Sequence, residues 1–139
     1  MRTEELKSKI LRDAEEINRL GARVKETFRA PRTEANVEAW RKACAEFYCR
    51  YEELAFPGGY TGAHERLLAG DAQTIEAALC FLEVRPYFFR SGYMFAKLIK
   101  KIKHAPLSKK QTDRLKRIVE DYERWKREKA ARRIASRQL

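Results

Sequence analysis

Apolar residues recur at steps of three and four near the start of the chain, and this spacing limits the possible folds more than any other feature. The series is Leu6, Ile10, Ala14, Ile17, Leu20, Val24 and Phe28. Residues at such steps share one face of an α-helix, so the pattern predicts an amphipathic helix over about residues 3–28. No stretch alternates apolar and polar residues for long enough to indicate a half-buried strand. With only 6 Gly and 4 Pro among 139 residues, we expect an all-α fold.

Proline, glycine and capping residues predict where the other helices begin and end. Pro31 breaks the first helix, and the Thr33 hydroxyl can cap a second helix that reaches about Leu54. A short helix is expected over about residues 62–69, and Asp71 is expected to cap the next, which reaches about residue 84. Ser91 is expected to cap a helix over about 92–103. A Ser108–Gln111 capping box opens the last helix, from about 109 to 133 or beyond. We therefore expect a single compact domain of about five or six helices, with a long basic C-terminal helix projecting from its body.

The second helix carries an unusually aromatic stripe. It consists of Val37, Trp40, Cys44, Phe47, Tyr48, Tyr51 and Leu54. Large rings at helical spacing are typical of a hydrophobic core, so we expect these side chains to be buried. The cysteines are Cys44, Cys49 and Cys80, an odd number without the spacing of a disulfide framework or a zinc site. We expect all three thiols to be reduced and buried as small apolar groups.

The net charge of +11 is concentrated in the last third of the sequence. Residues 91–139 hold 16 Lys and Arg against 5 Asp and Glu, whereas residues 1–90 hold 15 of each sign. A charge asymmetry of this kind indicates which partners the protein attracts and says little about its fold. The partners that a basic segment attracts are phosphate backbones, anionic lipid surfaces and acidic proteins.

The last predicted helix changes character at Trp125. Its apolar stripe consists of Leu115, Ile118, Val119, Tyr122 and Trp125, and the same face continues with Lys126, Lys129 and Arg133. Burying unpaired cations is strongly unfavourable, so this last part cannot lie against a core. We therefore predict a helical domain over residues 1–125 and a basic C-terminal arm, helical or disordered, over residues 126–139.

The charge of this region has two interpretations. Four acids have an arginine four residues later, namely Asp113 with Arg117, Glu120 with Arg124, Glu123 with Arg127 and Glu128 with Arg132, and such pairs stabilise a solvated helix. The remaining cations favour polyanion binding instead. These candidate binding residues are Lys97, Lys100, Lys101, Lys103, Lys109, Lys110, Arg114, Lys126, Lys129, Arg133 and Arg137.

A smaller candidate anion site lies at Arg90-Ser91-Gly92. The start of a helix exposes backbone N–H groups, Gly92 lets an anion approach, and Arg90 can hold a phosphate in a bidentate way. The alternative is an ordinary serine cap beside an exposed arginine.

Residues typical of catalysis or metal binding are sparse. The histidines are His64 and His104, and neither belongs to a metal-binding spacing. No pair of carboxylates is isolated from basic neighbours, so we expect no enzymatic activity, no metal and no cofactor. The longest uncharged apolar run, residues 77–82, is too short to span a bilayer, so we expect a soluble cytoplasmic protein without membrane insertion.

These observations favour a non-catalytic protein that binds nucleic acid with little sequence preference through its basic C-terminal third. Tyr87 and Tyr93 either stack on unpaired bases or pack in the core. The alternative function is that of a small helical adaptor, inhibitor or immunity-type protein that docks on an acidic protein partner through the same residues.

Overall fold

The fold is all-α, as predicted. A computed structural model describes residues 2–138, and over that range the chain forms six α-helices and no strand. Their bounds are α1 (Thr3–Arg29), α2 (Glu34–Ala55), α3 (Ala63–Leu68), α4 (Ala72–Val84), α5 (Ser91–Ile102) and α6 (Lys109–Arg137). The chain divides into two compact units, the first ending at Pro106 and the second beginning at Leu107.

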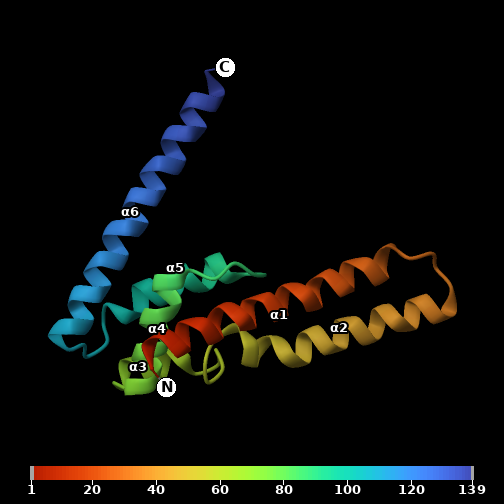
Figure 1. Ribbon diagram of the computed structural model, residues 1–139, viewed down its shortest axis with the longest axis horizontal. Coiled ribbons are helices and arrows are strands. Elements are labelled where there is room, and N and C mark those ends of the chain that lie inside the picture. Colours follow the sequence, from red (N-terminus) through yellow and green to blue (C-terminus); the bar gives the residue numbers. More distant parts are fainter. Residues whose placement is uncertain (1, 139) are drawn as a thin grey trace. The chain divides into compact units, whose positions relative to one another are not determined.

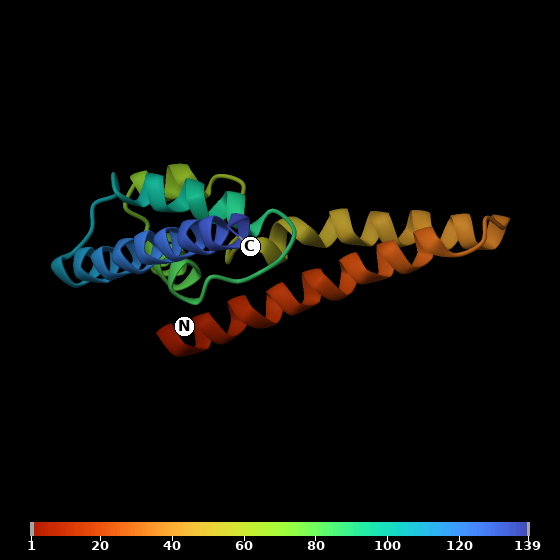
Figure 2. The same ribbon diagram turned by 90° about the horizontal axis from the view of Figure 1, so that it is seen from above.

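In the first unit, α1 and α2 form an antiparallel hairpin. A four-residue connection, residues 30–33, joins them, and the Thr33 hydroxyl accepts a hydrogen bond from the Asn36 backbone N–H at 3.2 Å, as its predicted capping role requires. Figures 1 and 2 both show this hairpin extending beyond the cluster formed by α3, α4 and α5. The buried residues of α1 are Leu6, Ile10, Ala14, Ile17 and Leu20. The predicted stripe is therefore buried only up to Leu20, and Phe28 near the turn is exposed.

Helix α4 is the most deeply buried element of the first unit and contacts α1, α3 and α5. Its buried residues are Thr74, Ile75, Ala77, Ala78, Leu79, Cys80, Phe81 and Leu82. Asp71 caps the helix, because its carboxylate accepts hydrogen bonds from the Thr74 backbone N–H at 3.0 Å and from the Thr74 hydroxyl at 2.5 Å. The core of this unit therefore lies around α4, where helices pack on several sides (Figure 1).

The loop between α2 and α3 is fixed by Arg66. The guanidinium donates hydrogen bonds to the Gly59 carbonyl at 2.8 Å and to the Thr61 carbonyl at 3.0 Å. Its Nε donates to the hydroxyl of Thr74 at 3.1 Å, which ties the loop to the start of α4. Gly59 has a φ of 86°, a conformation that residues with a Cβ rarely adopt. The loop carries Tyr60, and α3, which carries His64, packs on α5.

The prediction of a buried aromatic stripe on α2 is wrong. The buried residues of this helix are Ala43 and Ala55, whereas Tyr48 is exposed. The rest of the stripe, Val37, Trp40, Cys44, Phe47, Tyr51 and Leu54, is half-buried. Along most of its length α2 packs on α1, and one neighbouring helix covers only a narrow strip of a cylinder. All three cysteines are free, and the prediction that they are buried holds for Cys80 alone, since Cys44 is half-buried and Cys49 is exposed.

The second unit consists of α6 and the residues before it. The predicted capping box is confirmed, because the Ser108 hydroxyl accepts from the Gln111 N–H at 3.2 Å and the Gln111 side chain accepts from the Ser108 N–H at 2.8 Å. The helix continues past Trp125 to Arg137 without a break. Every residue from Lys126 to Gln138 is exposed. The arm as predicted also includes Leu139, which lies outside the described residues, and a domain boundary after Trp125 stays a prediction.

Candidate polyanion-binding surface

Helix α5 has one buried face and one cationic face. Its buried residues are Ser91, Met94, Phe95, Leu98, Ile99 and Ile102. On the opposite side, Arg90, Tyr93, Lys97 and Lys100 follow one another at steps of three and four, Lys101 lies four residues after Lys97, and all five are exposed. At about 100° per residue these five positions lie within roughly a third of a turn. We call them the α5 face. Lys103, the C-cap residue, is also exposed but lies on another side of the helix.

Tyr93 lies between two cations of the α5 face. The Arg90 guanidinium carbon is 5.7 Å from the centre of the Tyr93 ring, and the Lys97 ammonium nitrogen is 4.6 Å from it. A hydrogen bond from Lys97 lowers the pKa of Tyr93, and the same bond raises the pKa of Lys97. Lys97 is therefore positively charged throughout the neutral range and is held beside an exposed ring.

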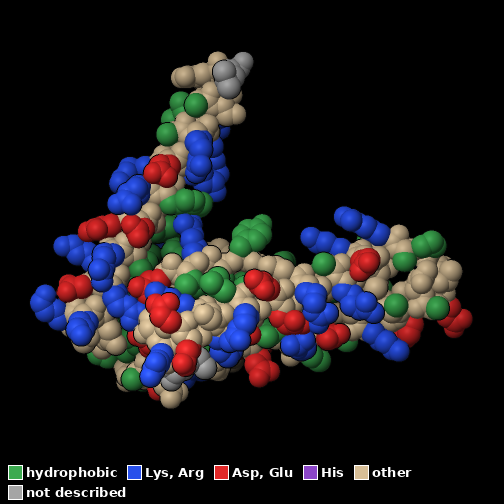
Figure 3. All heavy atoms as spheres, in the orientation of Figure 1, with side chains coloured by type: hydrophobic (Ala, Val, Ile, Leu, Met, Phe, Trp, Pro, Cys, Tyr) green, Lys and Arg blue, Asp and Glu red, His purple; other side chains and the backbone are tan. Residues whose placement is uncertain are grey.

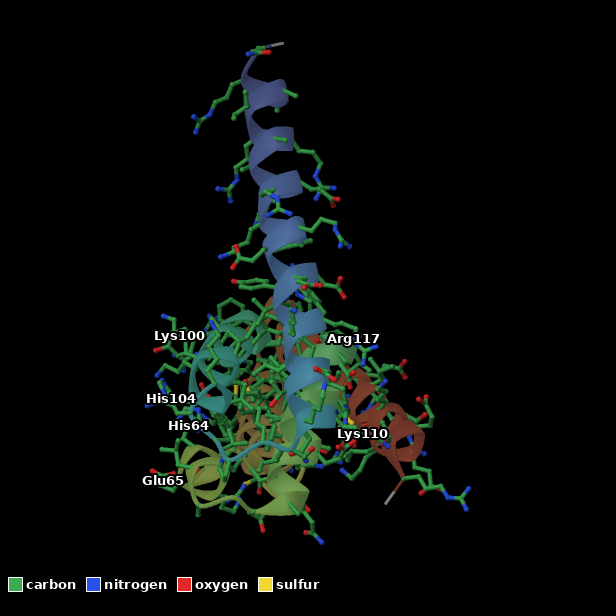
Figure 4. All side chains as sticks on the ribbon, turned by 90° about the vertical axis from the view of Figure 1, so that its left-hand side faces the viewer. His64, Glu65, Lys100, His104, Lys110 and Arg117 are labelled. Atoms are coloured by element: carbon green, nitrogen blue, oxygen red, sulfur yellow. The ribbon has the colours of Figure 1, made fainter. Side chains whose placement is uncertain are left out.

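Tyr60 and His64 lie next to the α5 face. The Tyr60 hydroxyl and His64 Nε2 are 3.1 Å apart, in hydrogen-bonding contact. Burial lowers the pKa of His64, and the positive charge of Lys101 lowers it further. Burial raises the pKa of Tyr60, while the nearby Lys97 opposes that change. The start of α3 thus lies within the electrostatic field of the α5 lysines, and Figure 4 shows His64, His104 and Lys100 along one edge of this unit.

The predicted Ser91 cap is wrong. Arg90, in the left-handed conformation with φ 67°, is the N-cap residue, and Ser91 is the first residue of α5. The Ser91 side chain is 5% exposed, and its hydroxyl accepts a hydrogen bond from the Phe88 backbone N–H at 2.9 Å. The hydroxyl stabilises the turn before the helix, because a buried N–H needs an acceptor. Of the three residues predicted to seat a phosphate, Arg90 and Gly92 are at the surface and Ser91 is not.

The cations of α6 lie almost entirely at the surface. Those predicted to bind a polyanion are Lys109, Lys110, Arg114, Lys126, Lys129, Arg133 and Arg137, all exposed except the half-buried Arg114. From residue 126 to residue 137 there are six basic residues and one acid. Figure 3 shows Lys and Arg side chains over much of this helix. The exposure of residues 126–138 agrees with the expectation that this part of α6 is solvated, while the arm as a separate part of the protein stays a prediction.

The ion pairs of α6 differ from the predicted ones. Asp113 pairs with Lys109 at 3.6 Å rather than with Arg117, and Glu123 pairs with Lys126 at 3.3 Å rather than with Arg127. Arg124 pairs with Asp121 at 3.4 Å. Steps of three and four both bring side chains together on a helix, so the sequence could not decide between them. Such exposed pairs are weak, and they leave Lys109 and Lys126 accessible to another anion.

One further sequence signal marks this surface. Between Glu83 and Asp113 the chain has eight Lys and Arg and no Asp or Glu, a span that coincides with α5 and its flanks. This acid-free segment is shorter than the C-terminal third, whose five acids all lie after residue 112. The exposure of Tyr87 and Tyr93, which the sequence left open, is settled by the structure, since both rings lie at the surface.

Comparisons with models of known protein families, with curated proteins and with solved structures each found no significant match. None of the helices within residues 2–138 is long and apolar enough to cross a lipid bilayer. The same part of the chain contains no cluster of three or more His, Cys, Asp or Glu side chains arranged to hold a metal ion.

Proposed function

We propose that this protein binds nucleic acid without catalysis and with little dependence on sequence, through the α5 face and the exposed cations of α6. The observation that supports this most strongly is the α5 face. Its four cations are exposed, share one side of a helix and belong to a segment without acidic residues. Lysine and arginine side chains neutralise phosphates and release counterions, which provides affinity without reading bases.

Anchoring of α5 makes this surface suitable for binding. Six of its residues are buried, so the backbone that carries Arg90, Lys97, Lys100 and Lys101 is held in place. A preorganised surface loses less conformational entropy on binding than a mobile one. The cations from Lys126 to Arg137 add positive charge on a second unit, which raises the attraction to any polyanion.

The test measures binding of the full chain to fluorescent DNA and RNA oligonucleotides of several sequences by anisotropy, at a series of salt concentrations. We expect similar affinities across sequences and a linear fall of log affinity with log salt. Absence of binding at low salt would overturn the proposal. So would recovery of one acidic protein partner after nuclease treatment together with no oligonucleotide binding, the result that the alternative function predicts.

A charge-matched pair of variants locates the surface. Replacing Lys97, Lys100 and Lys101 with Gln removes three charges from the α5 face. We expect the slope of log affinity against log salt for a single strand to decrease in magnitude by about 2, because each lost phosphate contact contributes roughly 0.7. The control replaces Arg23, Lys25 and Lys42, exposed cations of the α1–α2 hairpin, with Gln. Equal losses in the two variants would show that net charge, and not the α5 face, determines binding.

A further inference from the structure

Three exposed aromatic rings of the first unit are Tyr48 on α2, Phe89 before α5 and Tyr93 on α5. Tyr48 is 77% exposed, Phe89 61% and Tyr93 56%. Rings of this size are usually buried, because each covers a large apolar area. We call these three residues the aromatic strip.

The strip rests on other rings. The Phe89 ring lies 6.1 Å from that of Phe47 and 6.2 Å from that of Tyr51, and Phe47 in turn lies 5.9 Å from Tyr48. The Tyr51 hydroxyl donates a hydrogen bond to the Phe89 carbonyl at 2.6 Å, which fixes the backbone at that position. The exposed rings Tyr48 and Phe89 are thus supported from α2 on a half-buried aromatic layer.

The aromatic strip and the α5 face are parts of one surface. Tyr93 belongs to both, with Arg90 and Lys97 on its ring. Phe89 directly precedes Arg90 in the chain, and the charge of Arg90 acts on Tyr51, the residue beneath Phe89. Exposed rings and cations therefore alternate from Phe89 through Arg90 and Tyr93 to Lys97, on the side of the first unit that carries α5.

Alternation of rings and cations suits a nucleic-acid strand whose bases are unpaired. Each base of a single strand offers a free π face for stacking, whereas a duplex hides these faces inside its helix. Cations beside the rings can contact the phosphates that join stacked bases. A duplex would gain from the lysines alone and would leave the rings exposed to water.

We propose that the ligand of this surface is single-stranded nucleic acid, with bases stacked on Tyr93, Phe89 and Tyr48 and phosphates held by Arg90, Lys97, Lys100 and Lys101. This inference rests on the proposed nucleic-acid binding and specifies its ligand. Stacking tolerates any base, in agreement with weak sequence preference.

The experiment compares oligo(dT) with a DNA duplex of equal phosphate number, using the full chain and its Tyr93→Leu and Phe89→Leu variants. We expect oligo(dT) to bind more tightly than the duplex, and each variant to weaken oligo(dT) binding about tenfold while duplex binding stays the same. Tyr93→Phe keeps the ring and is expected to bind like the unmodified protein. Phe28→Leu serves as the matched control, because Phe28 is an exposed ring near the turn of the hairpin.

The outcomes separate this inference from the proposed function. Equal binding of single strand and duplex, with no specific loss in the ring variants, would overturn stacking and leave nucleic-acid binding intact. An equal loss on both ligands in the ring variants would also overturn it, because the rings would then act on phosphate contacts or on folding. Absence of binding to both ligands at low salt would overturn both proposals. Thermal unfolding of each variant identifies any that fails to fold.

Discussion

Helix α5 and the last part of α6 are both rich in lysine and arginine, yet they carry their charge in different ways. In α5, six of twelve residues are buried and the cations lie on the opposite face. From Lys126 to Arg137 of α6 every residue is exposed. The first helix therefore holds its charges on a packed scaffold, and the second holds them on a helix that is solvated on all sides.

The difference predicts different roles for the two regions in the proposed binding. Charges on a packed helix keep their spacing, so their contacts with a ligand cost little ordering. Charges on a solvated helix raise the long-range attraction and the rate of encounter. We therefore expect the α5 face to set the affinity of the complex and the α6 cations to set mainly its association rate.

Core substitutions provide the largest test of this comparison. Leu98 of α5 has no exposed surface, so Leu98→Ala leaves a cavity and is expected to lower the free energy of unfolding by about 2–5 kcal/mol. The matched change Ile134→Ala on α6 removes a side chain that is 58% exposed, and we expect it to stay within about 0.5 kcal/mol of the unmodified protein. Urea unfolding followed by circular dichroism measures both. A large loss in Ile134→Ala would show that the end of α6 is packed.

The start of α6 gives a second and smaller effect. Ser108→Ala removes one half of the capping box and is expected to lower stability by about 1 kcal/mol, because a backbone N–H loses its acceptor. Ser136→Ala lies inside the exposed part of the same helix and is the control, since alanine there favours helix slightly. Circular dichroism during thermal unfolding compares the two. If both variants unfold like the unmodified protein, the cap does not define where α6 begins.

The smallest predicted effect concerns His64. Burial and the charge of Lys101 lower its pKa, while Glu65 raises it and Lys97 lowers it. We expect Lys101→Gln to move the pKa of His64 back toward 6.5, and Lys25→Gln on α1 to leave it unchanged. Titration of the histidine signals by NMR measures the pKa of His64 in both variants. Neither variant changes Tyr60, the hydrogen-bond partner of His64. An unchanged pKa in Lys101→Gln would place His64 outside the field of the α5 face.

The same shift predicts how stability depends on pH. Because the pKa of His64 is lower in the folded state than its ordinary value of 6.5, the unfolded chain binds more protons once the pH falls below about 6.5. The contribution of His64 to stability is thus present above that pH and decreases in acid. His64→Gln is expected to reduce the loss of stability between neutral and mildly acidic pH.

Local signals in the sequence predicted the helices well. Thr33, Asp71 and Ser108 each cap the helix they were expected to cap, since a cap involves only residues within one turn. Ser91 is the exception, because its hydroxyl bonds to the turn before the helix instead of to the helix itself. A serine hydroxyl can accept a hydrogen bond from the residues before it or after it, and the sequence does not decide between the two.

The degree of burial follows the number of neighbouring helices and not the apolar pattern alone. The α4 residues lie among three other helices and are buried, while the aromatic stripe of α2 lies mainly against α1 and is half-buried or exposed. Periodicity shows which side of a helix is apolar, but the number of neighbours decides how much of that side is covered.

By itself the sequence determined the all-α fold, most helix ends and the exposure of the cations beyond Trp125, because these depend on interactions within a few residues and on the cost of burying charge. Only the tertiary structure decided that Tyr48, Phe89 and Tyr93 lie at the surface and that Tyr93 lies beside Arg90 and Lys97. The physical reason is that exposure depends on which other helices lie nearby, and residues far apart in the chain supply those neighbours.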